Sequence, residues 1–201
     1  MSDGEKAVER WYSDRVQSEI TVVRWGTFGT PVLVLPSAGG DAEEIERFGL
    51  VSACGPLLAE GRVKLYSVDS VAGQAMVRKT GSAAYRMWLL NQFHECVRWE
   101  VVPAIHADLG GRAMDVIACG ASIGAFNALA VLCRYPDVFV SCGVYEPLIV
   151  RNRSMVPTFE SAGMTVRYVE ARDGHSWENW RDRLREGLSW IFPGPQKFFY
   201  E

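Results

Sequence analysis

The sequence has no long hydrophobic run, no secretory pattern and no excess of positive charge. No apolar stretch approaches the roughly 20 residues that a membrane-spanning helix needs. Residues 1–11 are polar and charged, without the basic region and apolar stretch of a signal peptide. Lysine and arginine number 21 against 24 aspartates and glutamates, which gives a net charge of −3. We therefore expect no membrane and no nucleic acid among the partners.

The five cysteines and three histidines form no metal-binding pattern. No two cysteines form a CxxC pair, and no histidine has a second histidine or cysteine at metal-ligand spacing. Four of the five cysteines lie in apolar segments, which is typical of reduced, buried thiols. We therefore expect a cytoplasmic protein that needs no metal and no cofactor.

The chain of 201 residues has the length of one domain and can bury a core without crosslinks. Short apolar runs alternate with longer stretches of helical spacing. The predicted strands are 20–24, 31–35, 63–68, 114–119, 138–144 and 165–169, and the predicted helices are 42–59, 82–107, 123–133, 148–162 and 177–191. Strands joined by helices indicate a mostly parallel sheet with helices on both faces. We therefore predict a single α/β domain over residues 1–201.

The segment Gly120-Ala-Ser122-Ile-Gly124 follows a predicted strand and opens a predicted helix. In this context GxSxG is typical of a tight turn that strains the backbone of its serine and requires small neighbours. Such a turn projects the hydroxyl above the end of the sheet. We therefore predict that Ser122 is a nucleophile; the alternative is a glycine-rich turn without chemistry.

A serine hydroxyl needs a base to take its proton, and in this fold order the acid and then the base follow the serine. His175 is the only histidine after Ser122, and it lies in a predicted loop between the last strand and the last helix. Glu146 follows the predicted strand 138–144 directly, and we favour it as the acid that orients the imidazole. Asp173, two residues before His175, is the alternative acid.

Two backbone amides should form an oxyanion hole. We expect one from Ile123, which follows the nucleophile, and the other from Ala38 or Gly39 in the glycine-rich turn 37–40. This turn lacks the lysine and the Ser/Thr of a phosphate-binding loop. We expect Trp177 and Trp180 to line the substrate site; the alternative is that they pack the last helix on the sheet.

These segments resemble the esterase family of α/β-hydrolases that takes in enterochelin-esterase-like, feruloyl-esterase-like and S-formylglutathione-hydrolase-like enzymes, and mycolyltransferases. The resemblance covers nearly the whole chain. Its carriers are PVLVLPSAGGDAEEIERFG, LYSVDS, GASIGAFNALAVLCRYPDVF, GVYEPLIVRNRS and YVEARDGHSWENWRDRL. It implies Ser122 as nucleophile, His175 as base and an acid at Glu146.

The chain departs from this family between the nucleophile and the acid. Only 24 residues separate Ser122 from Glu146, whereas family members usually have another strand, helix and cap-like excursion there. We therefore predict an α/β-hydrolase-like fold that lacks one strand–helix unit and has little or no cap. A narrowed sheet leaves an exposed edge, which favours a homodimer.

The predicted function is that of a serine esterase. A catalytic triad of Ser122, His175 and Glu146 would cleave a small-molecule carboxylic ester through an acyl-enzyme on the serine. An acyltransferase would use the same groups with an alcohol or amine in place of water. A non-catalytic binding or assembly protein that keeps the fold is the alternative from a different class.

Overall fold

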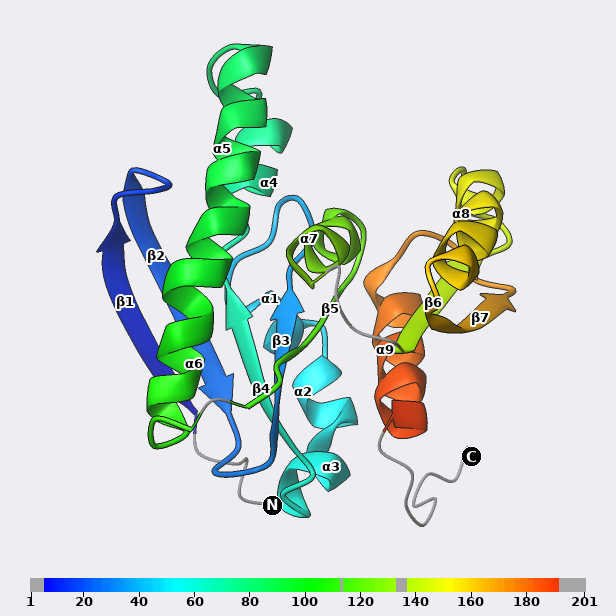
Figure 1. Cartoon of the computed structure of the whole chain (residues 1–201), viewed down its shortest axis with the longest axis horizontal. Helices are drawn as coiled ribbons and strands as arrows, with labels where there is room; N and C mark the ends of the chain where they lie inside the picture. The colour runs from blue at the N-terminus through cyan, green and yellow to red at the C-terminus, as the bar shows by residue number, and fades with distance from the viewer. Residues whose placement is uncertain (1–5, 113, 133–136, 192–201) are drawn as a thin grey trace. The chain divides into compact units, whose positions relative to one another are not determined.

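The computed structural model describes residues 6–112, 114–132 and 137–191. The chain divides into two compact units, Met1–Val131 and Leu132–Glu201, and each is described here by itself (Figure 1). The single domain expected over residues 1–201 stays a prediction.

The first unit is built on a five-stranded sheet in the order β1-β2-β4-β3-β5. Its strands are β1 (Ala7–Ser13), β2 (Ser18–Trp25), β3 (Thr30–Leu35), β4 (Val63–Val68) and β5 (Ile117–Gly120). β1 pairs antiparallel with β2 and β2 pairs antiparallel with β4, whereas β3 pairs in parallel with both β4 and β5. The prediction of a mostly parallel sheet is therefore wrong for this unit, whose sheet is mixed. The reason is β2, which runs antiparallel to both of its neighbours: to β1, through a short hairpin, and to β4.

The helical runs 83–108 and 123–132 of the first unit agree with the predicted helices, whereas the helix predicted over 42–59 is broken and a helix at 71–77 was not predicted. They are α1 (Glu44–Arg47), α2 (Leu50–Ala53), α3 (Gly55–Ala59), α4 (Val71–Val77), α5 (Ala83–Cys96), the π-helix η1 (Val97–Val101), α6 (Val102–Asp108) and α7 (Ile123–Leu132). Three short helices replace the single helix predicted over 42–59. Gly49 has a φ of 77° between α1 and α2, and Pro56 lies in the first turn of α3. A left-handed residue and a proline each interrupt a continuous helix.

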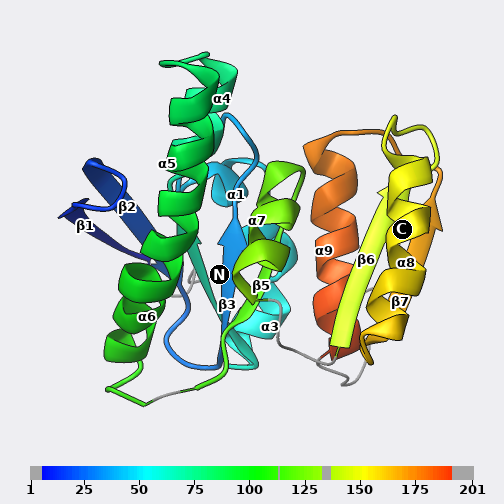
Figure 2. The same ribbon diagram turned by 45° about the horizontal axis from the view of Figure 1, so that its top comes forward.

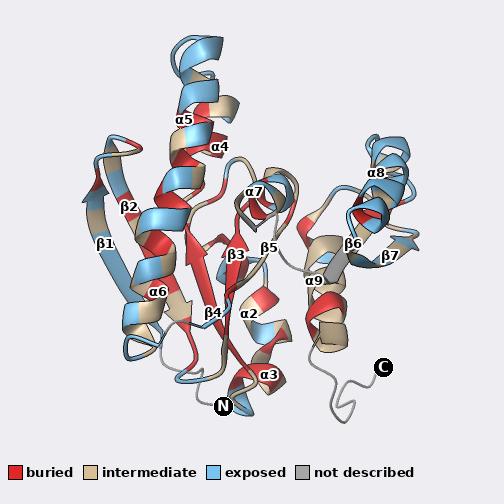
Figure 3. Cartoon of the chain, in the orientation of Figure 1, coloured by how far each residue is buried: buried red, intermediate tan, exposed pale blue. Residues whose placement is uncertain are grey.

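The core of the first unit lies between its sheet and the helical run α5–η1–α6. All six residues of β4 are buried, and five of the six in β3 (Figure 3). The helical run contributes buried residues at every fourth position: Leu89, Phe93, Val97, Val101 and Ile105. An α-helix has 3.6 residues per turn, so a four-residue repeat drifts around its surface. The wider π-helical turn at η1 compensates for this drift and keeps the five side chains on the core face.

The second unit contains β6 (Asp137–Gly143), α8 (Ile149–Ser161), β7 (Thr165–Ala171) and α9 (Trp177–Ile191). β6 and β7 pair in parallel, from Asp137 opposite Thr165 to Gly143 opposite Ala171. Figure 2 shows β6 between α8 and α9. Because the strands are parallel and in register, the loops that follow them leave from the same end of the pair.

The described part of the interval between Ser122 and Glu146 holds α7 and β6 and no further helix or strand, as predicted. None of the helices in the described ranges is both long and apolar enough to cross a membrane.

Candidate active site

Ser122 lies in a strained turn between β5 and α7. Its φ is 58°, in the left-handed region that L-residues other than asparagine and aspartate rarely adopt. The carbonyl of Ser122 accepts hydrogen bonds from the amides of Ala125 at 3.1 Å and Phe126 at 3.4 Å, so the helix starts directly after the serine. A conformation of this kind costs about 1–3 kcal/mol and clusters at functional sites.

Gly120 and Gly124, which flank Ser122, lie so close to the end of β3 that neither position has room for a side chain. Gly120 pairs with Leu35 across the parallel ladder. A Cβ atom at Gly124 would overlap the carbonyl oxygen of Leu35, and one at Gly120 would lie 2.6 Å from the same oxygen. The serine turn therefore packs against the point where β3 gives way to the turn 37–40. Two of the predicted amide sources, Ile123 and this turn, consequently leave the sheet at the same edge.

In the turn 37–40, Gly39 is exposed, Ser37 and Ala38 are half-buried and Gly40 is buried. The amide of Gly40 donates to the carbonyl of Ser37 at 3.0 Å and closes the turn. Gly39 is exposed, and a Cβ atom there would meet nothing within 4 Å. Within the described residues, the backbone amides of Ala38, Gly39 and Ile123 have no hydrogen-bond acceptor. These three predicted oxyanion donors are therefore open to a ligand.

His175 and Glu146 meet in the second unit. Nδ1 of His175 lies 2.7 Å from Oε2 of Glu146, and Oε1 of the same carboxylate accepts the amide of Gly143 at 3.2 Å. The Glu146 side chain is 9% exposed and the His175 side chain 42% exposed. A carboxylate on Nδ1 fixes the ring and favours the tautomer whose lone pair lies on Nε2.

The loops that carry this pair are joined by backbone contacts. The amide of Val144 donates to the carbonyl of Ala171 at 2.8 Å, and that of Tyr145 donates to the carbonyl of Asp173 at 3.3 Å. A Cβ atom at Gly143 would overlap the carbonyl oxygen of Asp173. The parallel register of β6 and β7 thus continues into the loops and brings the acid to the histidine.

The alternative acid, Asp173, has a different partner. Its Oδ2 lies 3.3 Å from Nε of Arg183 on α9. Trp177 is 7% exposed, which corresponds to the packing alternative rather than to a substrate wall. The tryptophan that contacts the histidine is Trp180, whose ring meets that of His175 edge-on with centroids 4.5 Å apart.

Of the residues predicted for the site, the first unit holds Ser122, Ile123, Ala38 and Gly39, and the second holds Glu146, His175 and Trp177. The described ranges contain no group of three or more His, Cys, Asp or Glu side chains that could hold a metal ion. Glu44 on α1 and Gln74 on α4 hold the turn 37–40 and were not predicted, because these contacts arise only when the two helices pack around the turn.

No protein-family model matches the sequence. One curated protein, an acetyl esterase of Caldicellulosiruptor saccharolyticus, is 27% identical over 56 residues. The match takes in 28% of this chain and spans only 21% of that protein's length.

Solved structures resemble the chain over nearly its whole length. A ferulic acid esterase matches with a TM-score of 0.64 and 14% identity over 93% of this chain and 97% of that one. An S-formylglutathione hydrolase from Agrobacterium tumefaciens matches with a TM-score of 0.63 and 12% identity, over 94% of this chain and 95% of that one. The enterobactin esterase FES from Shigella flexneri matches with a TM-score of 0.70 and 16% identity, over 93% of this chain and 59% of that one. These proteins are α/β-hydrolases, and the chain has the α/β-hydrolase fold that the sequence resemblance predicts.

Proposed function

We propose that this protein is a serine hydrolase that cleaves carboxylic esters of small molecules. The contact that carries the proposal is the one between Oε2 of Glu146 and Nδ1 of His175, at 2.7 Å. In an α/β-hydrolase fold, a histidine held from behind by a buried carboxylate is suited to act as a general base. The strained Ser122 is the residue whose proton it would take.

In the proposed reaction, Oγ of Ser122 attacks the acyl carbon while Nε2 of His175 takes the serine proton. The tetrahedral intermediate collapses, the bond to the alcohol breaks, and the imidazolium gives its proton to the leaving oxygen. Water then attacks the acyl-enzyme with the same histidine as base, which releases the acid and restores the serine. Glu146 stabilises the imidazolium in both steps.

The amide of Ile123, together with that of Ala38 or Gly39, would bind the oxyanion. These amides have no acceptor in the described part of the chain, and Ile123 opens a helix of ten residues. Donors that already point at the developing charge stabilise it without further reorganisation. The names of the similar solved structures, which include esterases and an S-formylglutathione hydrolase, support esters as the substrate class.

Two further expectations belong to this proposal. We place the protein in the cytoplasm, because Cys54, Cys96, Cys119 and Cys142 are free thiols. The homodimer stays a prediction from the narrowed sheet. Acyl transfer would use the same acyl-enzyme, so product analysis with and without an added alcohol or amine separates it from hydrolysis.

The test is covalent labelling with a fluorophosphonate. We expect the probe to modify the wild-type protein at Ser122, as read by peptide mass spectrometry. Ser122→Ala should lose the label and lower ester turnover by roughly 10⁴ or more, since triad members act as a unit. Ser52→Ala, an exposed serine on α2, is the matched control and should label as the wild type does. Folded wild-type protein that does not label, or undiminished labelling of Ser122→Ala, would refute the proposal.

A further inference from the structure

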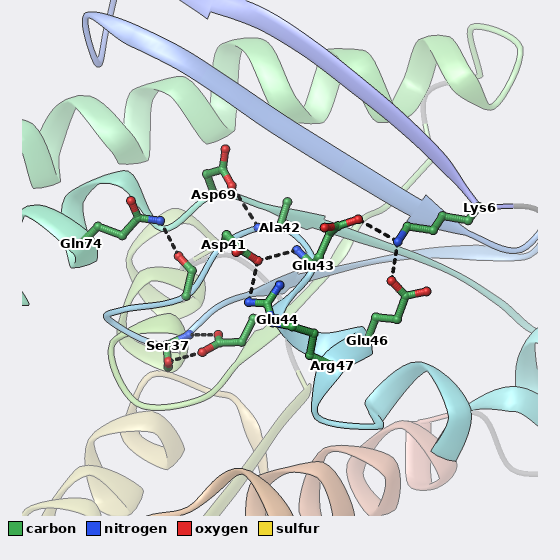
Figure 4. Close-up of polar contacts among 11 residues, drawn as sticks. Lys6, Ser37, Asp41, Ala42, Glu43, Glu44, Glu46, Arg47, Asp69 and Gln74 are labelled. Atoms are coloured by element: carbon green, nitrogen blue, oxygen red, sulfur yellow. Dashed lines mark hydrogen bonds and ion pairs between the residues drawn. The ribbon is translucent and has the colours of Figure 1, made fainter.

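A buried carboxylate holds the first residue of the turn 37–40. Glu44 is 5% exposed, and its Oε2 accepts the backbone amide of Ser37 at 2.8 Å (Figure 4). Its Oε1 accepts the hydroxyl of the same serine at 2.6 Å. Glu44 is the first residue of α1, so the helix that follows the turn reaches back to fix where the turn begins.

Within the described residues, the carboxylate of Glu44 forms no ion pair. A buried carboxylate is costly unless hydrogen bonds or an opposite charge satisfy it. The neighbouring cations are engaged elsewhere: Arg47 pairs with Asp41 at 2.8 Å, and Lys6 pairs with Glu43 at 2.7 Å and with Glu46. Within the described residues, the carboxylate accepts hydrogen bonds from the amide and the hydroxyl of Ser37, so its local role is to hold the turn.

Gly40 is fitted to the same carboxylate. A Cβ atom at Gly40 would overlap Oε2 of Glu44, so any other residue there would displace the carboxylate from Ser37. The carboxylate of Glu44 can therefore reach Ser37 only because Gly40 has no side chain. This arrangement gives the second glycine of the turn a specific purpose.

The far end of the turn is held from the other side. Nε2 of Gln74 on α4 donates to the carbonyl of Gly40 at 2.7 Å, and Oδ1 of Asp69 accepts the amide of Ala42 at 3.0 Å (Figure 4). A Cβ atom at Gly73 would lie 2.8 Å from Cα of Ala38, so α4 also packs directly on the turn. Both ends of the turn are thus held by hydrogen bonds, while the amides of Ala38 and Gly39 have no acceptor among the described residues.

We propose that Glu44 is a positioning residue for the oxyanion hole. By holding both donors of Ser37 it fixes the direction of the next two amides, those of Ala38 and Gly39. This inference rests on the proposed function, because it gives the turn a role in ester cleavage. Oxyanion donors are effective when they are preorganised, and loss of one costs roughly 10²–10³ in kcat. A turn that is held less firmly should therefore lower kcat, by less than the loss of a whole donor would.

The experiment compares Glu44→Gln with Glu43→Gln. Glutamine keeps the size of Glu44 but offers one accepting oxygen instead of two, so it turns an NH₂ group toward one donor of Ser37. We expect kcat for an ester to fall by about 10–100-fold while KM changes less than about threefold. Glu43→Gln is the matched control, since the Glu43 side chain is exposed and its carboxylate pairs with Lys6 rather than with the turn. It should retain wild-type values.

A thionoester of the same acid and alcohol separates positioning from general stability. Its sulfur is a weak hydrogen-bond acceptor, so its cleavage depends less on the amide donors. Glu44→Gln should therefore lower the ratio of ester to thionoester kcat, whereas a merely loosened fold would lower both rates together. Equal losses on the two substrates, or unchanged ester kcat, would overturn the proposal.

Failure of the proposed function has a separate signature. Wild-type protein that neither labels with a fluorophosphonate nor cleaves the ester overturns the function and this inference together. If Glu44→Gln labels at Ser122 but shows no change in the substrate ratio, only the inference fails. Should Glu44→Gln not fold, Ser37→Ala removes one of the two contacts and should lower the ratio in the same direction, by roughly 3–10-fold. An unchanged ratio in Ser37→Ala would then overturn the inference.

Discussion

Nδ1 of His175 lies 2.7 Å from Oε2 of Glu146, a residue 29 positions earlier in the chain. The carboxylate is almost buried and is also held by the amide of Gly143, while the imidazole stands more exposed beside Trp180. The acid thus lies behind the ring and fixes it. A ring that is oriented in this way needs no rearrangement before it accepts a proton.

Replacement of Glu146 by glutamine should slow catalysis without unfolding the protein. The amide is neutral and cannot stabilise the imidazolium, so we expect kcat/KM for an ester to fall by roughly 10²–10⁴. Fluorophosphonate should still label Ser122, although more slowly. Steady-state kinetics and circular dichroism measure the two effects.

Asp173→Asn is the matched control for that variant. Its carboxylate pairs with Arg183, so we expect turnover close to that of the wild type. If Asp173→Asn is severely impaired and Glu146→Gln is not, Asp173 is the acid and Glu146 has a structural role.

Gly124→Ala should destabilise the protein. Its Cβ atom would overlap the carbonyl oxygen of Leu35, so the serine turn must move away from β3. Overpacking of this kind costs about 1–3 kcal/mol. Gly55→Ala is the control, because a Cβ atom there meets nothing within 4 Å and the residue begins α3. Urea unfolding should show a lower midpoint for Gly124→Ala alone; equal midpoints would show that the turn tolerates a side chain.

The Arg153–Glu170 pair should make the free energy of unfolding depend on pH in the acid range. Two hydrogen bonds from the guanidinium, at 2.6 and 2.7 Å, lower the pKa of Glu170 from its usual 4.5 to about 2. A lowered pKa in the folded state stabilises the protein fully above pH 4.5, and this contribution is lost as the pH falls toward 2.

The comparison is between wild type and Glu170→Gln. The difference between their urea midpoints should be constant above about pH 5 and should shrink between about pH 4.5 and 2. A difference that persists unchanged at pH 2 would show that the carboxylate charge does not contribute.

Cys96, which is buried, and Cys119, which is half-buried, should resist modification in the folded protein. Burial raises the pKa of Cys96 to about 11 and that of Cys119 to about 12. Because the thiolate is the reactive form, we expect both to react slowly with iodoacetamide at pH 8 and rapidly in denaturant. Peptide mass spectrometry separates them from Cys133, which lies outside the described residues. Equal rates in the folded and unfolded protein would contradict the burial.

The sequence predicted the elements with strong hydrophobic patterns and missed those without them. β4 and α9 have the predicted bounds, 63–68 and 177–191. β1 was missed because most of its residues are exposed, so no apolar alternation marks it. α4 was missed because it is short and contains Gly73, which its contact with Ala38 requires. Because β1 was missed, its antiparallel hairpin with β2 was missed as well.

The candidate site was predictable where its chemistry follows chain order. Ser122, His175 and Glu146 were chosen by their places after strands, and the structure brings Glu146 to His175. The clamp on the turn 37–40 was not predictable in the same way. Gln74 lies 34 residues from Gly40, and a contact between a side chain and a distant carbonyl leaves no pattern in the sequence.

The positive φ of Ser122 lowers the stability of the folded chain at the residue that the proposed chemistry requires. Glycine adopts that conformation without strain, so Ser122→Gly removes a cost of about 1–3 kcal/mol from the folded state. In a lineage that needed only a folded scaffold, mutation could replace the serine with glycine and the chain would become harder to unfold. An inactive descendant of this protein is therefore expected to be the more heat-resistant one.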